Sequence, residues 1–403
     1  MRVLLINNDV GAGGGAQTVT ATTAGVLAQA GHDVTTLAAP AGRRAGIYSP
    51  ACRRAVARAV ARRRPDVAHV HNVYERLTLS VVDALHAARV PTVMTLHDYR
   101  AVCPNGILLA PDGQCRRCVT GTPAHAVRLA CLHGSRCASA RAAAEVLLNR
   151  SRGAYHRIDV LVSPSEHLAA VMRLGGLPAD RIAVVRNAVH AAPAPRGPAP
   201  GAPEFVFAAR LTPAKGLATL VDAARRLGDR ARITVLGAGR SAQRLQEAAR
   251  GLPIELRGLA DHADVHAALA GATAALVPSI WVENCPLAIL EAAAVGVPAI
   301  ASDLGTMREL IDDGVDGILF PPGDGRALAA AIVELAEDRA LAAELGAAAW
   351  RRVRERHAPD AYRDAIVACY ARARWHSGGA GGRASSCSAS ASTAPGDSRA
   401  AQR

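Results

Sequence analysis

Short apolar runs alternate with helical patterns through the first 190 residues of the chain. Runs that are apolar at most consecutive positions are typical of parallel strands buried on both faces of a sheet. Helical stretches such as residues 18–30 and 77–88 separate most of them. The strand candidates of this half are residues 3–6, 34–37, 67–70, 92–96, 160–162 and 182–185. The pattern predicts a Rossmann-like N-terminal domain over residues 1–190.

A stretch rich in Pro, Ala and Gly over residues 191–203 indicates an interdomain linker, and the alternation restarts after it. The strand candidates of the second half are residues 205–208, 233–236, 254–256, 274–277, 299–301 and 318–320. They predict a second Rossmann-like domain over residues 204–350. The predicted fold class is therefore α/β, with two doubly wound domains that face a central cleft.

The C-terminal end of the chain divides into two parts. Residues 361–374 are amphipathic, so we expect residues 351–376 to form a helix that packs back on the N-terminal domain. Residues 377–403 are rich in Gly, Ser and Ala without an apolar period, and we expect a disordered, dispensable tail there.

The charge balance is basic, with 47 Lys and Arg against 34 Asp and Glu, a formal net charge of +13. This excess favours anionic partners such as nucleotides, phosphates or an acidic membrane surface, and solvated surface arginines are the plainer explanation. Aromatic residues make up only 3%, which disfavours a nucleic-acid binder that stacks bases. The sequence contains no long apolar run and no signal-peptide pattern, so we expect a cytoplasmic protein. Peripheral binding at the inner face of the membrane is compatible with this expectation.

A glycine-rich turn follows the first predicted strand and opens a helix, at residues 11–17. Glycines at such a turn let a phosphate approach backbone amides at the helix N-terminus, so Gly14 and Gly15 are candidate phosphate contacts. The turn formally fits a dinucleotide fingerprint ending in Ala16, and a purely structural tight turn also explains it. No acidic residue stands at the end of the second strand, which argues against an oxidoreductase.

Two further constellations lie in the second half. Arg210 and Lys215 follow its first predicted strand, where a forked guanidinium and an ammonium can grip a diphosphate together. Lys215 is the only lysine of the chain. Glu283 and Glu291 lie eight positions apart around Pro286, which we expect in the first turn of a helix. Separated carboxylates suit the recognition of hydroxyl-rich ligands, and solvated helix charges are the alternative.

The segment from Glu283 to Glu291 resembles the E-x7-E signature of the retaining GT-B glycosyltransferases of family 4. The similarity extends over about residues 1–375, through the glycine turn, the strand ends at residues 66–72 and 95–98, the pair Arg210 and Lys215, and the loops at residues 304–309 and 320–324. The segment at residues 40–50 is short for the family, in a region that often contacts the acceptor.

The resemblance implies a transfer of a hexosyl group from a nucleoside-diphosphate sugar to a hydroxyl acceptor, in polysaccharide, glycolipid or other glycoconjugate biosynthesis. The resemblance implies four catalytic residues. Glu283 would lie beside the donor sugar, and His97 would contact that sugar from across the cleft. The diphosphate would be bound by Arg210 and Lys215. Donor contacts are implied for Gly14, Gly15, Asn284, Cys285, Leu287 and, on the ribose, Glu291. Fixed cations and amides can stabilise the leaving diphosphate without a metal, and the sequence has no D-x-D carboxylate pair.

Five of the nine cysteines lie within residues 103–137, a segment that resembles a cysteine-containing insertion in a subset of the same family. Structural disulfides are rare in the cytosol, where zinc is the usual reason for such spacing. A structural zinc site would use Cys103, Cys115, Cys118 and Cys131. Free thiols packed in a loop core are the alternative.

Other functions remain open from the sequence. A phosphorylase or an epimerase would share the GT-B fold, and each would act without a hydroxyl acceptor. A Rossmann oxidoreductase leaves the motifs of the second domain unexplained. A zinc-containing nucleic-acid-binding protein fits the cysteines and the charge, but not two complete βα domains.

Overall fold

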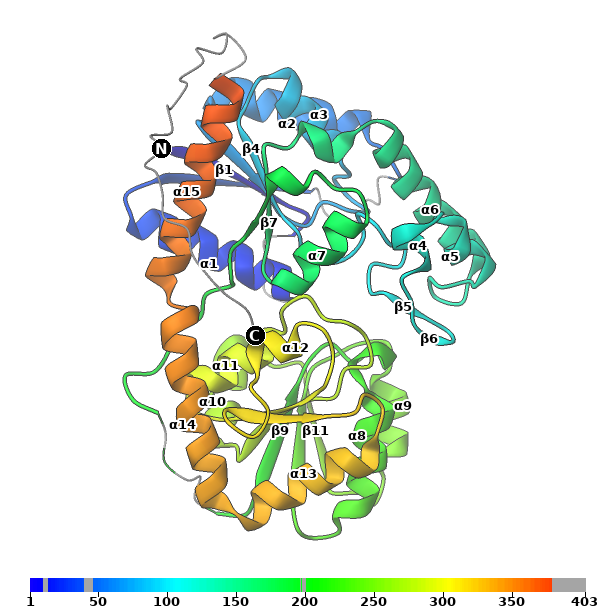
Figure 1. Ribbon diagram of the computed structural model, residues 1–403, viewed down its shortest axis with the longest axis vertical. Coiled ribbons are helices and arrows are strands. Elements are labelled where there is room, and N and C mark those ends of the chain that lie inside the picture. The colour runs from blue at the N-terminus through cyan, green and yellow to red at the C-terminus, as the bar shows by residue number, and fades with distance from the viewer. Residues whose placement is uncertain (10–13, 40–45, 196, 198–200, 379–403) are drawn as a thin grey trace, which may run out of the picture.

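The computed structural model describes residues 1–9, 14–39, 46–195, 197 and 201–378. Two α/β domains are stacked along the long axis of the molecule, with the N-terminus in the upper domain of Figure 1. Each domain is built on one six-stranded sheet. Within the described residues, no helix combines the length and the apolar character needed to cross a bilayer.

The N-terminal sheet has the strand order β2-β1-β3-β4-β7-β8, and all neighbouring strands are parallel. The six predicted strands of this half are all present. Their bounds are β1 (Arg2–Asn7), β2 (Asp33–Ala38), β3 (Val67–Val70), β4 (Thr92–Thr95), β7 (Val160–Ser163) and β8 (Ile182–Val184). The order changes direction at β1, so the loops after β1 and β3 lie at the switch point where ligands bind in such sheets.

The C-terminal sheet repeats this topology, with the order β11-β10-β9-β12-β13-β14 and parallel neighbours throughout. Its six predicted strands are also present. Their bounds are β9 (Glu204–Ala208), β10 (Arg232–Leu236), β11 (Ile254–Gly258), β12 (Ala274–Val277), β13 (Ala299–Ser302) and β14 (Gly317–Phe320). The predicted α/β class with two doubly wound sheets is confirmed.

Helices cover the N-terminal sheet, and serine caps fix where three of them begin. Ser49, Ser135 and Ser165 each accept a hydrogen bond from a backbone N–H in the first turn of the helix that follows. The helices are α1 (Gly15–Gln29), α2 (Pro50–Arg63), α3 (Ser80–Ala87), α4 (Arg117–Thr120), α5 (Ala124–Arg128), α6 (Arg136–Ser151) and α7 (Glu166–Leu174). Between β4 and α6 the chain forms a lobe with a small hairpin of β5 (Leu109–Ala110) and β6 (Gly113–Gln114).

The helices of the C-terminal domain include α11, which carries the E-x7-E segment. Pro286 is the N-cap of α11, one position before the first turn in which we expected it. The helices are α8 (Leu217–Leu227), α9 (Ala242–Ala248), α10 (His262–Gly271), α11 (Leu287–Ala294), α12 (Met307–Leu310), α13 (Gly325–Glu337) and α14 (Arg339–Arg356).

The last helix, α15 (Pro359–Gly378), returns to the N-terminal domain and runs along its left side in Figure 1. Its apolar face packs against Val3, Val67 and Val93, and Tyr362 hydrogen-bonds Thr23 at 2.6 Å. The expected start at residue 351 is wrong, because α14 continues to Arg356. Pro359 has no N–H for the preceding helix, so a new helix begins there. Residues 377–378 belong to α15 rather than to the expected tail, and residues 379–403 lie outside the described residues.

We expect the substitution Ile366→Ala to destabilise the protein by about 2–5 kcal/mol, because it leaves a cavity where α15 packs on the sheet. Ile366 is fully buried in that contact. Urea unfolding measures the change. Trp375→Ala on the same helix is the control, since Trp375 is 82% exposed. Equal stabilities of the two variants would contradict the docking of α15.

Candidate functional site

The predicted site residues lie at strand ends and helix starts where the two domains meet. Gly14 and Gly15 open α1, His97 follows β4, and Arg210 and Lys215 follow β9. The segment from Ser279 to Leu287 connects β12 to α11. Such positions leave backbone N–H groups without helical partners, so they can bind a ligand.

Lys215 and Glu283 form the central contact of the site. The Lys215 Nζ lies 2.7 and 2.8 Å from the two carboxylate oxygens of Glu283, which is only 4% exposed. Ser279 donates a further hydrogen bond to the same carboxylate, and Lys215 also lies over the ring of Trp281 at 5.6 Å. Both Glu283 oxygens are therefore engaged, which suits a carboxylate held in place to orient a ligand or a cation.

Gly216 allows this contact to form. Its φ is +77°, and a Cβ at this position would lie 1.7 Å from the backbone oxygen of Pro278. Any other residue would force the loop after β9 away from the end of β12. The close crossing of these two backbones is what brings Lys215 onto Glu283.

The glycine turn of the N-terminal domain lies close to the other domain. A Cβ on Gly14 would lie 3.4 Å from Arg210 Nη2, and a Cβ on Gly15 would lie 3.8 Å from the Leu287 side chain. The start of α1 and the Arg210 guanidinium are therefore near neighbours, as the expected diphosphate contacts require. Residues 11–13 of the expected turn lie outside the described residues.

Asn284 and Cys285 fix the geometry where α11 approaches the N-terminal domain. The Asn284 side chain donates to the backbone oxygen of His97 at 2.7 Å, and its own oxygen accepts the Cys285 N–H at 2.7 Å. Burial raises the pKa of the Cys285 thiol to about 12, so it stays protonated and is no nucleophile. These residues couple the start of α11 to the strand end that carries His97.

His97 belongs to a group of three histidines, of which the sequence singled out only His97. Its Nε2 lies 3.0 Å from Nδ1 of the fully buried His71, whose ring stacks on His69 at 4.3 Å. His69 in turn contacts Thr95 and, on α15, Tyr370. With its Nε2 engaged, the other ring nitrogen of His97 is the one that could meet a ligand. The signal for His71 was its position directly after β3, the neighbour of β4 in the sheet.

Burial keeps these histidines neutral. It lowers the pKa of His97 to about 4 and that of His69 to about 3, with the charge of His97 adding to the shift of His69. The pKa of His71 lies well below its usual range for the same reason, and its two histidine neighbours add to the shift. A neutral His97 can donate or accept a hydrogen bond at physiological pH.

Glu291 lies on the side of α11 that faces α10. Its carboxylate is 3.7 Å from His262 Nε2, and burial raises the pKa of Glu291 against the opposing effects of His262 and His266. The structure therefore places this glutamate beside the histidines of α10, apart from the contact between Lys215 and Glu283.

A further contact between the domains, which the sequence analysis did not predict, joins α12 to the start of α7. The Glu309 carboxylate on α12 accepts the backbone N–H groups of Glu166 and His167 at 2.9 and 2.6 Å, at the start of α7. Thr306 adds a hydroxyl contact to Ser165 at 3.3 Å. A carboxylate at a helix N-terminus is favourable, so this contact holds the two domains together beside the site.

The four predicted metal ligands line one small cavity in the lobe: Cys103, Cys115, Cys118 and Cys131. All four are free cysteines. Among the residues that the structure describes, no three Cys, His, Asp or Glu side chains are already arranged around one ion position. Cys137 is exposed and does not line this cavity.

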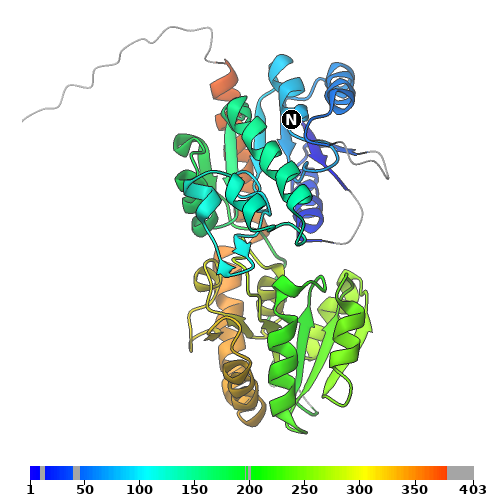
Figure 2. The same ribbon diagram turned by 90° about the vertical axis from the view of Figure 1, so that its right-hand side faces the viewer.

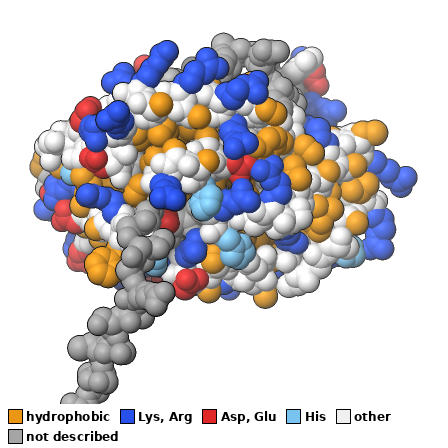
Figure 3. Space-filling model, turned by 90° about the horizontal axis from the view of Figure 1, so that it is seen from above, with side chains coloured by type: hydrophobic (Ala, Val, Ile, Leu, Met, Phe, Trp, Pro, Cys, Tyr) orange, Lys and Arg blue, Asp and Glu red, His pale blue; other side chains and the backbone are white. Residues whose placement is uncertain are grey.

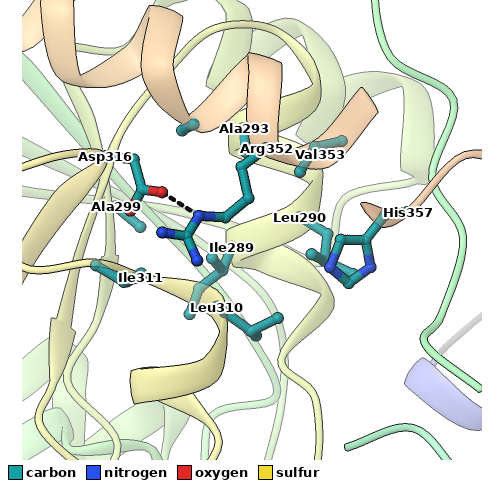
Figure 4. Close-up of a pocket in the computed structure, with 11 residues that line it drawn as sticks. Ile289, Leu290, Ala293, Ala299, Leu310, Ile311, Asp316, Arg352, Val353 and His357 are labelled. Atoms are coloured by element: carbon teal, nitrogen blue, oxygen red, sulfur yellow. Dashed lines mark hydrogen bonds and ion pairs between the residues drawn. The ribbon is translucent and has the colours of Figure 1, made fainter. Parts of the chain in front are cut away.

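Another cavity lies between α11 and α14 and is lined mainly by apolar side chains (Figure 4). Arg352 on α14 pairs with Asp316 there, and His357 Nδ1 contacts the Asn187 oxygen at 2.7 Å. The predicted catalytic and donor-binding residues are not among those that line it. This cavity is therefore a gap in the packing between α11 and α14.

Both domains match known families of proteins. A family model described as "Glycosyltransferase Family 4" matches residues 13–192, and one described as "Glycosyl transferases group 1" matches residues 202–338. A protein of Salmonella typhimurium named as a colanic acid biosynthesis glycosyltransferase, WcaL, is 33% identical over 195 residues, 45% of this chain and 48% of that protein. The amylovoran biosynthesis glycosyltransferase AmsK of Erwinia amylovora is 31% identical over 208 residues, 49% of this chain and 48% of that protein.

The chain spans about half the length of these curated relatives. Over nearly its whole length it resembles the crystal structure of Anabaena Alr3699/HepE in complex with UDP and glucose. The TM-score is 0.68 at 18% identity, and the match covers 92% of this chain and 99% of that one. The predicted GT-B fold is thereby confirmed.

We expect the free energy of unfolding to fall as the pH is lowered from about 7 to about 5. In the unfolded chain, histidines bind protons near their usual pKa of about 6.5, whereas in the folded protein His69 binds one only at about pH 3 and His97 only at about pH 4. Each of the two neutral histidines therefore contributes to the free energy of unfolding above the unfolded pKa. This contribution is lost as the pH falls below that value. Urea unfolding across this range should give a shallower pH dependence for His69→Gln and an unchanged one for the exposed His190→Gln. An unchanged dependence for His69→Gln would contradict the neutral histidine group.

Proposed function

The chain belongs to the family 4 glycosyltransferases of the GT-B fold, and on that premise we propose that it transfers a hexosyl group from a nucleoside-diphosphate sugar to a hydroxyl acceptor with retention of configuration. The observation that carries the proposal is the buried contact of Lys215 with Glu283 at the start of α11, next to His97. The relatives WcaL and AmsK support a role in polysaccharide biosynthesis, and glycolipids or other glycoconjugates are the remaining acceptor classes.

The leaving group of such a transfer is a nucleoside diphosphate, on which negative charge grows as the glycosidic bond breaks. Arg210 lies close to Gly14 at the start of α1, and Arg210, Lys215 and the amides at Gly14 and Gly15 would supply positive charge and donors to this group. Fixed groups of this kind stabilise developing charge without reorganisation. We propose that these residues are sufficient and that the transfer proceeds without a divalent cation.

The remaining residues orient the sugar and the nucleoside. Glu283, fixed by Lys215 and Ser279, would accept hydrogen bonds from sugar hydroxyls, and the amides of Asn284, Cys285 and Leu287 would donate to them. His97 would contact the sugar from the N-terminal domain through Nδ1. Glu291, between α10 and α11, would hold the ribose hydroxyls.

The donor is tested by thermal unfolding in the presence of UDP-, GDP-, ADP- and TDP-sugars, followed by product analysis with the stabilising donor. One nucleotide sugar should raise the melting temperature, and added Mg²⁺ or Mn²⁺ should leave turnover unchanged. NMR of the product should show that the anomeric configuration of the donor is retained. Release of sugar that occurs only with phosphate would identify a phosphorylase instead. Isomerisation of the donor in the absence of an acceptor would identify an epimerase.

We expect Lys215→Ala and Glu283→Ala each to lower kcat/KM for transfer by about 10²-fold or more, because each removes a fixed group that acts on the reacting donor. Circular dichroism should show that both variants keep the fold, with lowered melting temperatures, because each variant leaves one charge of the buried pair uncompensated. Arg225→Ala, on the exposed face of α8, is the charge control and should retain wild-type turnover. Near wild-type turnover of either site variant would contradict the assignment.

We also propose that the end of the N-terminal domain touches an acidic membrane surface while the site works. Figure 3 views this end, where blue basic side chains outnumber red acidic ones. Exposed arginines at every fourth position of α2 form one stripe, at Arg54, Arg58 and Arg62. Each basic residue near an anionic surface contributes about 1 kcal/mol of attraction.

Replacing the three stripe residues by Gln should weaken co-sedimentation with phosphatidylglycerol vesicles by about 10²-fold at low salt, as follows from about 1 kcal/mol per arginine. Replacing Arg225, Arg244 and Arg250 of the C-terminal domain by Gln removes the same charge and should have little effect. Equal loss in the two triple variants would show that net charge alone is responsible.

A further inference from the structure

The lobe that follows His97 has little apolar core of its own. We define the cysteine lobe as residues 103–137, which contain β5, β6, α4 and α5. Its strands have two residues each and its helices four and five. Elements this short bury little surface, so a lobe of this size needs another source of order.

Four thiols meet inside this lobe. Cys103, Cys115, Cys118 and Cys131 line a cavity of about 10 Å³, about the least space that a single water needs. Cys103 comes before the hairpin of β5 and β6 and Cys131 comes after α5, so this cavity joins the beginning of the lobe to its second half.

The turn that carries Cys103 holds its side chain at the cavity. The Cys103 thiol donates a hydrogen bond to Asn105 Oδ1 at 3.0 Å, and Asn105 lines the same cavity. Gly106 closes this turn with a φ of +74° and donates to the Cys103 oxygen at 2.9 Å. One of the four thiols is thus fixed at the cavity wall, where a metal would replace its proton.

We propose that the cysteine lobe binds one Zn²⁺ through Cys103, Cys115, Cys118 and Cys131. Four thiolates are a donor set that zinc takes in tetrahedral structural sites, and the C-x-x-C pair has a spacing common in them. Among the described residues no three such side chains yet surround one ion position, so binding requires the cysteine side chains to turn toward a common centre.

A cation is what would allow four thiolates to share this cavity. Without one, four converging thiolates would repel one another. A divalent soft cation removes that repulsion and displaces the thiol protons, so binding is coupled to ordering of the lobe.

The position of the lobe gives the metal a role in the function proposed above. The lobe hangs from the N-terminal domain toward the other domain, as the cyan segment of Figure 2 shows. His133 Nδ1 of the lobe lies 2.7 Å from Arg240 in the loop after β10. Arg150 on α6 reaches the backbone oxygens of Val102 and Cys118. A metal that orders the lobe therefore also shapes the rim beside His97.

The test begins with metal analysis of full-length protein purified without a metal-affinity tag. Wild type and Cys137→Ser should each contain one zinc per chain, and the double variant Cys115→Ser/Cys118→Ser should contain none. Cys137 is the matched control, since it lies in the same lobe but outside the cavity. Chelation should turn four slowly reacting thiols of wild-type protein into fast ones, whereas the buried Cys285 and Cys369 should stay slow.

Co²⁺ binding to chelated wild-type protein keeps the test independent of how the double variant folds. A thiolate-to-Co²⁺ charge-transfer band that saturates at one equivalent, and that added Zn²⁺ abolishes, is the expected result. Absence of zinc together with absence of this band would overturn the proposal, as would disulfides among the four cysteines in wild-type protein that binds no zinc. Chelation should leave the melting shift by the nucleotide-sugar donor in place, so a failure of the zinc site is distinguishable from a failure of the proposed transfer.

Discussion

The buried contact between Lys215 and Glu283 is the constraint on which the arrangement of the site depends. A carboxylate that is 4% exposed is costly without a partner, and removing one member of a buried pair leaves the other charge uncompensated. The loop after β9 must therefore cross the end of β12, and only a glycine fits at residue 216. Ser279 and Trp281 complete the surroundings of the pair, so one local electrostatic requirement fixes the relative position of two loops and the start of α11.

The two domains are joined beside this pair by polar and apolar contacts. Asn284 reaches the His97 backbone, and Glu309 caps α7. Val282, in the same loop as Glu283, is 4% exposed and packs into the apolar core of the N-terminal domain. The start of α11 is therefore held against the N-terminal domain, so the geometry suits a site that both domains complete.

Most of the fold could be predicted from the sequence, because strands that are buried on both faces of a parallel sheet consist of short apolar runs. The twelve strands are present, and Gly14, Arg210, Lys215 and Glu283 lie at the strand ends and helix starts where their motifs placed them. Contacts between residues distant in sequence could not be predicted. His71 acts on His97 only because β3 and β4 are neighbours, and the Glu309 cap depends on how two domains meet. The break between α14 and α15 was missed because both sides of it are strong helix formers.

The residues that we propose for the donor and the lobe that follows His97 are held by different means. Lys215, Glu283 and Arg210 stand on the ends of a six-stranded sheet, where packing on both faces fixes the backbone. The rim beside His97 is instead formed by the cysteine lobe, whose strands have two residues each. A rim with so small a core can change its sequence without unfolding the sheet beneath it. Diphosphate recognition can therefore stay constant while the lobe, in contact with Arg240, determines which hydroxyl compound reaches the sugar.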